Sequence, residues 1–291
     1  RLVYDMKNRR FPLPGELVLR ETEAVEGKED AVKEAYNYAG ATYDFYREVF
    51  GRNSLDGKGM SLISSVHYGN RTNNAFFNGE QMLYGDGDGR IFIRFTKALD
   101  VVAHELTHGV VQHTSNLEYH GQSGALNESF ADVMSACVKQ WSTSKQTVAQ
   151  ADWLLGDAIM GPGVTAKSLR TFKAEKAYEN DPILGDDPQP KHMDNLYRGE
   201  EDEGGVHINS GIPNHAFYLV ATALGGEVMP FPAATKNPLR MLANARAIVG
   251  IIARERVSLV HARSRAPAWS ALWAARWAGV PFVTTYHGAY K

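Results

Sequence analysis

The sequence predicts an α+β protein that is joined to a separate α/β segment at its C-terminal end. Three observations support this prediction. Before residue 98, apolar and polar residues alternate around Gly and Asp turns, which is typical of strands. From Ala98 onward, apolar residues recur at the spacing of helices. From Val228, the charge balance changes sharply, which indicates a boundary.

The change at Val228 is large. Residues 228–291 carry nine Lys/Arg and one acid, Glu255, whereas the first 227 residues carry 22 Lys/Arg and 32 acids. Three of the five Trp also follow Val228. The sequence therefore predicts that residues 228–291 have a different origin from the rest.

The overall composition is that of a globular protein. Of the 291 residues, 44% are hydrophobic and 22% are charged. The net charge of -2 gives no reason to expect nucleic acid or a membrane surface as a partner, and no run of about 18 apolar residues could span a bilayer. We expect a monomer. The single cysteine, Cys137, excludes an intrachain disulfide.

The N-terminal part reads as one helix followed by strands. Residues 27–51 have helical spacing and end at Gly51, a helix stop. Residues 60–70 and 79–95 alternate around Gly and Asp, and we expect antiparallel strands there. The run "DGDG" at 86–89 is a turn. It lacks the Glu that an EF-hand calcium loop requires.

The middle of the chain reads as three helices and a loop. Helical spacing covers residues 98–113, 124–141 and 208–226, and the last of these ends at a Gly pair. Residues 185–205, "GDDPQPKHMDNLYRGEEDEGG", are polar and rich in Pro, Gly and acids, which predicts a long loop.

The last segment alternates between helix and strand. We expect helices at 237–256 and 266–279, and strands at 257–263 and 280–288. This order is typical of a parallel α/β unit.

The run "HELTH" indicates a metal site. His104 and His108 are four residues apart, so a helix places both imidazoles on one face, about 6 Å apart at the Cβ atoms. Two neutral imidazoles at this separation suit tetrahedral Zn²⁺. Glu105 follows the first ligand and points beside the metal, where a base can take a proton from water.

The third ligand must come from another segment. A metzincin needs Gly at 111 and His at 114, but the sequence has Val111 and Thr114. His113 lies off the ligand face, and Glu128 near the start of the next helix is the better candidate. Asp132, four residues later, can accept the second N–H of a zinc-bound His. The alternative is that these carboxylates belong to a solvated helix face.

"HELTHGVVQHTSNLEYHGQSGALNESFAD" resembles the thermolysin family of neutral metalloproteases, and most closely its protealysin-like bacterial branch. "NNAFFNGEQMLYGDGDG", "SLRTF" and "GGVHINSGIPNHAFYL" are further family blocks, in family order, and the likeness covers about residues 1–227. The resemblance implies a thermolysin-like two-lobed fold. Residues 1–114 would form the β-rich lobe with the zinc-binding helix, and 115–227 an incomplete helical lobe.

The resemblance implies a zinc-dependent endopeptidase and a role for each matching residue. His104, His108 and Glu128 would bind zinc, and Glu105 would act on the attacking water. His207 and Tyr119 would donate to the oxyanion, and Asp202 would orient His207. The substrate would contact a further set of residues. Asn74 and Ala75 would hold the peptide as an added strand, Arg170 would bind a carbonyl, and an apolar pocket after the cut would be lined by Phe92, Phe95, Val101 and Leu169.

The chain departs from the family pattern at its calcium ligands. Lys139, Leu154 and Ala158 replace acids, while three acids remain: Asp100, Asp152 and Asp157. Because an ammonium group cannot coordinate a cation, we expect no double calcium site, and one calcium ion or none is left open.

Residues 228–291 resemble a piece of a family-4 GT-B glycosyltransferase, in the blocks "KNPLRMLANARAI" and "VSLVHARSRAPAWSALWAARWAGVPFVTTYHGAY". This resemblance implies a Rossmann-like fragment without its donor-nucleotide domain. We therefore expect a graft that transfers no sugar.

Three functions follow as hypotheses: an endopeptidase that acts on peptides or proteins, a glycosyltransferase-like module, or a zinc-binding but inactive chimera. The family resemblance implies secretion from a bacterium, and a cytoplasmic protein is the alternative. The chain starts at Arg1 without Met or an apolar leader. We expect either a removed leader or a fragment.

Overall fold

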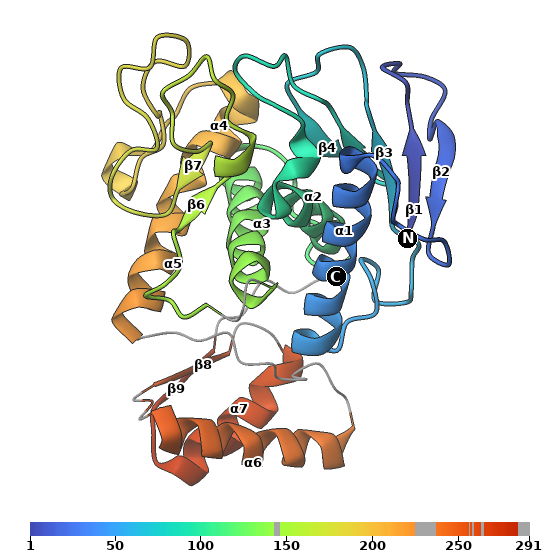
Figure 1. The fold of residues 1–291 in the computed structure, drawn as a ribbon. Coiled ribbons are helices and arrows are strands. Elements are labelled where there is room, and N and C mark those ends of the chain that lie inside the picture. The colour runs from blue at the N-terminus through green and yellow to red at the C-terminus, as the bar shows by residue number, and fades with distance from the viewer. Residues whose placement is uncertain (143–145, 225–236, 256, 258, 263–264, 285–291) are drawn as a thin grey trace. The chain divides into compact units, whose positions relative to one another are not determined.

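The computed structural model describes residues 1–142, 146–224, 237–255, 257, 259–262 and 265–284 (Figure 1). The chain divides into two compact units. The first unit comprises Arg1–Phe45 with Asn53–Val228, and the second comprises Tyr46–Arg52 with Met229–Lys291. The predicted boundary at Val228 lies outside the described residues.

The first unit contains a five-stranded sheet in the order β2-β1-β3-β5-β4. Its strands are β1 (Leu2–Asp5), β2 (Glu16–Arg20), β3 (Ile63–Val66), β4 (Ala75–Phe77) and β5 (Met82–Tyr84). β1 pairs antiparallel with β2, and β5 pairs antiparallel with β4. β2 and β4 are therefore the edge strands, and one side of β4 is free of strand partners within this sheet.

The expectation of antiparallel strands at 60–70 and 79–95 was wrong in its pairing. β3 and β5 are parallel, with Ser64 opposite Met82 and Ser65 opposite Leu83. The reason is β4, which lies between them in sequence and takes the antiparallel position beside β5. Residues 90–95 also leave the sheet. Phe92 forms an isolated bridge with Met160, and a 3-10 helix, η1 (Phe95–Lys97), follows.

Helix α1 (Asp30–Phe50) confirms the helix expected at 27–51. It ends at Gly51, whose φ of 65° lies in the left-handed region that glycine adopts without a steric cost. Its apolar positions, among them Ala35, Ala39 and Phe45, are buried. This is the one-sided burial that helical spacing predicts.

Two central helices carry most of the predicted site. Helix α2 (Leu99–Gln112) and helix α3 (Gly121–Ser142) pack against each other in the middle of the unit (Figure 1). α2 is buried on most sides, because it lies between the β-rich part and the helical part. A buried helix keeps its polar side chains only where they have partners, so its two histidines need explanation.

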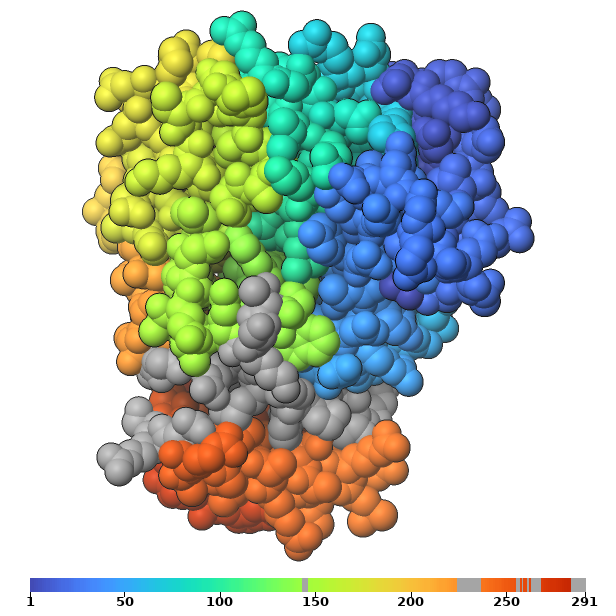
Figure 2. Space-filling view, viewed as in Figure 1, coloured from blue at the N-terminus to red at the C-terminus, as the bar shows by residue number. Residues whose placement is uncertain are grey.

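The segment after α3 returns to the β-rich part. Two short strands, β6 (Leu154–Leu155) and β7 (Arg170–Thr171), pair antiparallel, and η2 (Asp157–Ile159) lies between them. The main-chain N–H of Gly161 donates to the carbonyl of Ile91 at 2.8 Å. In Figure 2, this yellow-green segment accordingly lies beside the teal segment that precedes α2.

The remaining helices of the first unit are short. η3 (Met193–Asn195), α4 (Glu201–Asn209) and α5 (Gly211–Leu224) follow the long irregular stretch. The loop predicted for 185–205 overlaps the assigned start of α4 at 201–205, where the main chain is kinked and not a regular helix. Four successive residues in it, Asp202 to Gly205, have positive φ values between 51° and 82°. An aromatic cluster of Trp153, Phe172 and Phe217 packs α5 against the segment after α3.

The second unit alternates between helix and strand, as the sequence predicts. It contains α6 (Pro238–Glu255), β8 (Val260–Ala262), α7 (Arg265–Ala278) and β9 (Phe282–Thr284). β8 and β9 are parallel, and Ala245, Ile252 and Ala274 form the core between the helices. Among the described residues of both units, no helix has the length and the apolar run that a membrane span requires.

An imidazole between two carboxylates ties β3 to neighbouring loops. Nδ1 of His67 lies 2.7 Å from Oδ2 of Asp86, and Nε2 contacts Oε1 of Glu29. The hydrogen bond to Asp86 and the pairing with Glu29 outweigh burial and raise the pKa of His67 to about 9. This contribution to stability is complete below pH 6.5 and is lost as the pH rises through 9.

We expect His67→Gln to lower the free energy of unfolding by about 1–2 kcal/mol at pH 6, a value discounted for the solvent exposure of Glu29. At pH 9.5 the variant should match the wild type, because the native imidazole has then lost its proton. Urea unfolding at the two pH values measures this. His113→Gln is the control, since His113 is exposed at the end of α2. An equal loss at both pH values would contradict the prediction.

Candidate metal centre and active site

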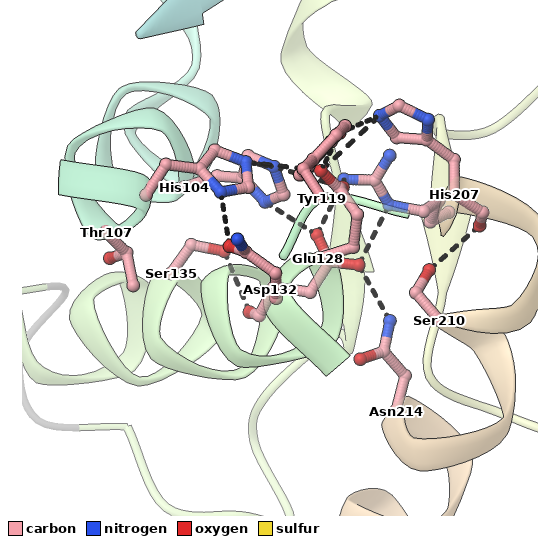
Figure 3. Close-up of polar contacts among 12 residues, drawn as sticks. His104, Thr107, Tyr119, Glu128, Asp132, Ser135, His207, Ser210 and Asn214 are labelled. Atoms are coloured by element: carbon pink, nitrogen blue, oxygen red, sulfur yellow. Dashed lines mark hydrogen bonds and ion pairs between the residues drawn. The ribbon is translucent and has the colours of Figure 1, made fainter. Parts of the chain in front are cut away.

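Two neighbouring helices bring three potential metal ligands together, of which Figure 3 labels His104 and Glu128. The Nε2 atoms of His104 and His108, one turn apart on α2, are 3.0 Å from each other. Glu128 of α3 places Oε2 3.4 Å from Nε2 of His104 and Oε1 3.2 Å from Nε2 of His108. Among the described residues, this is the cluster whose ligand atoms all lie within 4.8 Å of one another.

The polar contacts behind the two rings set their tautomers. Nδ1 of His104 faces Oδ1 of Asp132 at 2.8 Å, and Nδ1 of His108 faces Oδ1 of Asn127 at 2.9 Å. The Asn127 amide is oriented by its donation to the carbonyl of Leu117. Because both facing oxygens are acceptors, each Nδ1 carries the hydrogen, and in a neutral ring each Nε2 presents a lone pair.

The inner atoms of this cluster therefore oppose one another. With both rings neutral, the two Nε2 lone pairs oppose each other at 3.0 Å, and Oε2 of Glu128 is buried without a hydrogen-bond partner. Glu128 is 0% exposed, so this carboxylate has no access to water. Buried polar atoms left in this state are costly unless a cation lies between them. Two imidazole nitrogens and one carboxylate fit the donor set of a catalytic zinc site.

The histidines and carboxylates of the cluster shift one another's pKa values. Burial alone would lower the pKa of His104, but Glu128 and Asp132 outweigh it and raise that pKa to about 10. Burial alone would raise the pKa of Glu128, but the two imidazoles hold it well below its usual range. The site therefore stabilises positive charge next to an ionised carboxylate, which is the environment that a divalent cation requires.

Asp132 lies behind the three potential metal ligands and contacts the side chains of His104, Arg170 and Asn214. Its carboxylate accepts from Nε of Arg170 at 2.9 Å, from Nη2 of Arg170 at 2.6 Å and from Nδ2 of Asn214 at 2.7 Å. Arg170 was predicted to bind a substrate carbonyl. It lines the cavity, yet its guanidinium donates twice to Asp132, so only its remaining N–H groups can face a substrate.

A second group of polar side chains approaches the cluster from the other side (Figure 3). The hydroxyl of Tyr119 donates to Oε1 of Glu128 and lies 3.2 Å from Nε2 of His207. Nδ1 of His207 is 2.5 Å from Oδ1 of Asp202, whose Oδ2 accepts the main-chain N–H groups of His207 and Ile208. The left-handed turn at residues 202–205 brings Asp202 back under His207.

A cavity of about 800 Å³ opens over the cluster and contains Glu105. Burial raises the pKa of Glu105, and the two histidines lower it. Most of the predicted substrate-binding residues line this cavity: Asn74, Ala75, Phe95, Val101, Leu169 and Arg170. Phe92 is not among its lining residues. Its ring packs against that of Phe95, which does line the cavity, with the centroids 5.5 Å apart.

The three acids that remain among the family's calcium-ligand positions converge on Lys139. Its Nζ lies 2.8 Å from Oδ1 of Asp157, 3.1 Å from Oδ2 of Asp152 and 3.2 Å from Oδ2 of Asp100. The carbonyl of Leu154 is a further acceptor at 3.4 Å. An ammonium group thus occupies the position that the carboxylates surround.

Sequence reasoning missed two side chains of the site, Asn127 and Asn214. Asn127 directly precedes Glu128, but no spacing rule marks it as the partner of His108. Asn214 and Asp132 are 82 residues apart in the sequence. Only the packing of α5 against α3 brings them together.

Two models of the same protein family match the chain. The family model described as "Thermolysin metallopeptidase, catalytic domain" matches residues 1–112, and "Thermolysin metallopeptidase, alpha-helical domain" matches residues 115–257. The second match extends past the predicted boundary at 228.

Two curated relatives and one solved structure are similar to the chain. An "Extracellular metalloprotease" of Pectobacterium carotovorum subsp. carotovorum is 52% identical over 226 residues, 78% of this chain and 64% of the relative. "Protease PrtS" of Photorhabdus sp. (strain Az29) is 50% identical over 229 residues, 78% of this chain and 61% of the relative. The precursor of protealysin from Serratia proteamaculans superposes with a TM-score of 0.76 at 44% identity, covering 94% of this chain and 86% of that one. The chain thus spans less than two thirds of the length of these two curated relatives.

Proposed function

The chain belongs to the thermolysin metallopeptidase family, and on that premise we propose that it is a zinc-dependent endopeptidase. The observation that carries the proposal is the cluster of opposed Nε2 atoms beside a buried carboxylate oxygen without a hydrogen-bond partner. His104, His108 and Glu128 would hold the zinc ion. A zinc ion bound there would polarise a peptide carbonyl and lower the pKa of a water molecule.

The side chains around the cluster would act as the general base and as hydrogen-bond donors to the oxyanion. Glu105 would take the proton of the attacking water and pass it to the leaving amine. Tyr119 and His207 would donate hydrogen bonds to the developing oxyanion, and Asp202 would hold His207 in place. The short contacts from Tyr119 to Glu128 and from His207 to Asp202 support these positions. One such donor is worth roughly 3 kcal/mol of the activation barrier.

The substrate would be a protein or peptide in extended conformation. Asn74 directly precedes β4 and Ala75 begins it, and this edge strand has an unpaired side that can accept an added strand. Phe95, Val101 and Leu169 would bury a bulky apolar side chain after the cut, with Phe92 supporting Phe95. Burying a Leu or Phe side chain there would contribute roughly 1.5–3 kcal/mol. Arg170 would face a substrate carbonyl with the N–H groups that Asp132 does not use.

Further parts of the proposal concern domains, calcium and location. Residues 1–114 and 115–227 would be the two lobes, and 228–291 a glycosyltransferase-like fragment that transfers no sugar. The parallel pair β8 and β9 agrees with an α/β unit but is not specific to a glycosyltransferase. Lys139 would replace a calcium ion between Asp100, Asp152 and Asp157. We propose a secreted monomer, and the name of the Pectobacterium relative supports secretion.

Removal of the metal tests this proposal. We expect the purified chain to carry about one zinc ion, to cleave peptides with Leu or Phe after the cut, and to lose this activity to a chelator and regain it with Zn²⁺. Glu128→Gln should weaken zinc binding by more than the 10- to 100-fold that outer partners contribute, because a ligand is lost directly. Glu175→Gln, an exposed change, is the control. Zinc binding without peptide cleavage would favour the inactive chimera. The absence of both zinc binding and cleavage would refute the proposal.

A further inference from the structure

Asp132 is held by more donors than an orienting carboxylate needs. It is fully buried, and its Oδ1 faces both Nδ1 of His104 and Nη2 of Arg170. Its Oδ2 accepts from Nε of Arg170 and from Nδ2 of Asn214, at 2.9 and 2.7 Å (Figure 3). Arg170 binds both oxygens as a bidentate pair, which restricts the orientation of the carboxylate. The Asn214 amide adds a separate hydrogen bond to Oδ2 from another helix.

The Asn214 side chain makes this contact although its own amide oxygen is buried without a hydrogen-bond partner, which destabilises the fold. It lies in the first turn of α5, is fully buried, and its Oδ1 has no hydrogen-bond partner among the described residues. Turning the amide round would point Oδ1 at the Asp132 carboxylate, acceptor against acceptor, so the observed orientation is the favourable one. An apolar side chain of similar size would avoid the unsatisfied oxygen. The hydrogen bond that the Asn214 side-chain N–H donates to Asp132 therefore explains why an amide occupies this position.

The start of α5 is also tied to the other side of the active site. The main-chain N–H of Asn214 donates to the carbonyl of Ser210 at 3.0 Å. The hydroxyl of Ser210 and the amide of Gln189 both donate to the carbonyl of His207, at 2.8 and 2.7 Å. A shift of this turn would thus reach His207 through Ser210 and reach His104 through Asn214 and Asp132.

We propose that Asn214 is a positioning residue of the metal centre. Its amide fixes Asp132, Asp132 holds the Nδ1–H tautomer and the ring plane of His104, and the Nε2 lone pair of His104 is thereby aimed between His108 and Glu128. This inference rests on the proposed zinc site, and it adds a residue from a third helix, α5, to the ligands from α2 and α3.

The test compares Asn214→Leu with Asn209→Leu. Asn209 is a buried asparagine at the end of α4 that bonds the main chain of Tyr197 and does not touch Asp132. Zinc affinity is measured by competition with a fluorescent chelator, and ring geometry by the visible absorption spectrum of the Co²⁺ form. We expect Asn214→Leu to bind zinc 10- to 100-fold more weakly and to alter the cobalt spectrum. Its melting temperature should fall less than that of Asn209→Leu, which should keep the wild-type affinity.

A second variant covers the case in which Asn214→Leu does not fold. Asn214→Asp keeps the shape but places an oxygen against Asp132, so at neutral pH it should weaken zinc binding at least tenfold. Wild-type zinc affinity and cobalt spectrum in a folded Asn214 variant would overturn the inference. A wild-type protein that binds no zinc would instead overturn the proposed function, so the two failures are distinguishable.

Discussion

Glu105→Gln is expected to lower kcat for peptide hydrolysis by about 100- to 10,000-fold, the contribution of a positioned general base, and to leave the zinc content unchanged. Glutamine has the shape of glutamate but cannot accept the proton of the attacking water. The zinc content should persist, because the three proposed ligands, His104, His108 and Glu128, are untouched. The measurements are kcat on a peptide with Leu after the cut and elemental analysis of the purified variant.

Glu118→Gln is the matched control. Glu118 lines the same cavity but is exposed. The Glu118→Gln variant therefore removes one negative charge by the same substitution as Glu105→Gln. We expect its kcat to stay within about threefold of the wild type, since exposed charges contribute less than about 1 kcal/mol. Normal turnover by Glu105→Gln would remove Glu105 from the mechanism. A loss of zinc in that variant would show that Glu105 supports the ligands instead.

Lys139→Met is expected to lower the free energy of unfolding by about 3–5 kcal/mol at pH 8, the typical effect of removing one partner from a buried ion pair. Asp100 is only 2% exposed and would lose its cationic neighbour. Burial already raises the pKa of Asp100, and Lys139 opposes that effect. Without the lysine, the carboxyl is more stable protonated, so the stability of the variant should recover as the pH falls towards 5. Urea unfolding at pH 5 and pH 8 measures this.

Calcium provides a second readout for the same position. Lys139→Glu turns the cluster into four acids around one point, and we expect millimolar Ca²⁺ to stabilise this variant but not the wild type. Lys176→Met is the control, because Lys176 pairs with Asp186 at 3.7 Å on the surface and should change stability by less than about 1 kcal/mol. A Lys139→Met variant as stable as the wild type would refute the substitution of an ammonium group for calcium.

Much of the candidate site follows from local spacing. A helix repeats every 3.6 residues, so the pair His104 and His108 and the pair Glu128 and Asp132 each share a face wherever the helices form. The helix positions were predicted to within three residues at the N-terminal ends of α1, α2 and α3. The alternating order of the second unit was predicted for the same reason. In each case the pattern lies within one short segment.

The pairing of strands did not follow from such patterns. Alternation places residues on a face of a strand but does not choose the neighbouring strand or its direction, so the parallel β3–β5 pair was missed. Phe92 is expected in the pocket wall from the resemblance alone, and only the fold shows that its ring packs against that of Phe95 and that its main chain pairs with Met160.

The sequence by itself determined which residue types could hold a metal ion and which of them share a helix face, because both depend on chemistry and on spacing within one helix. Only the tertiary structure decided what surrounds them: Asn214 against Asp132, Asn127 against His108, and the ammonium of Lys139 among three carboxylates. Several of these contacts join segments far apart in the chain, and all depend on how the helices and loops pack. No repeat in the sequence encodes that packing, so the partners that tune the site become visible only in the fold.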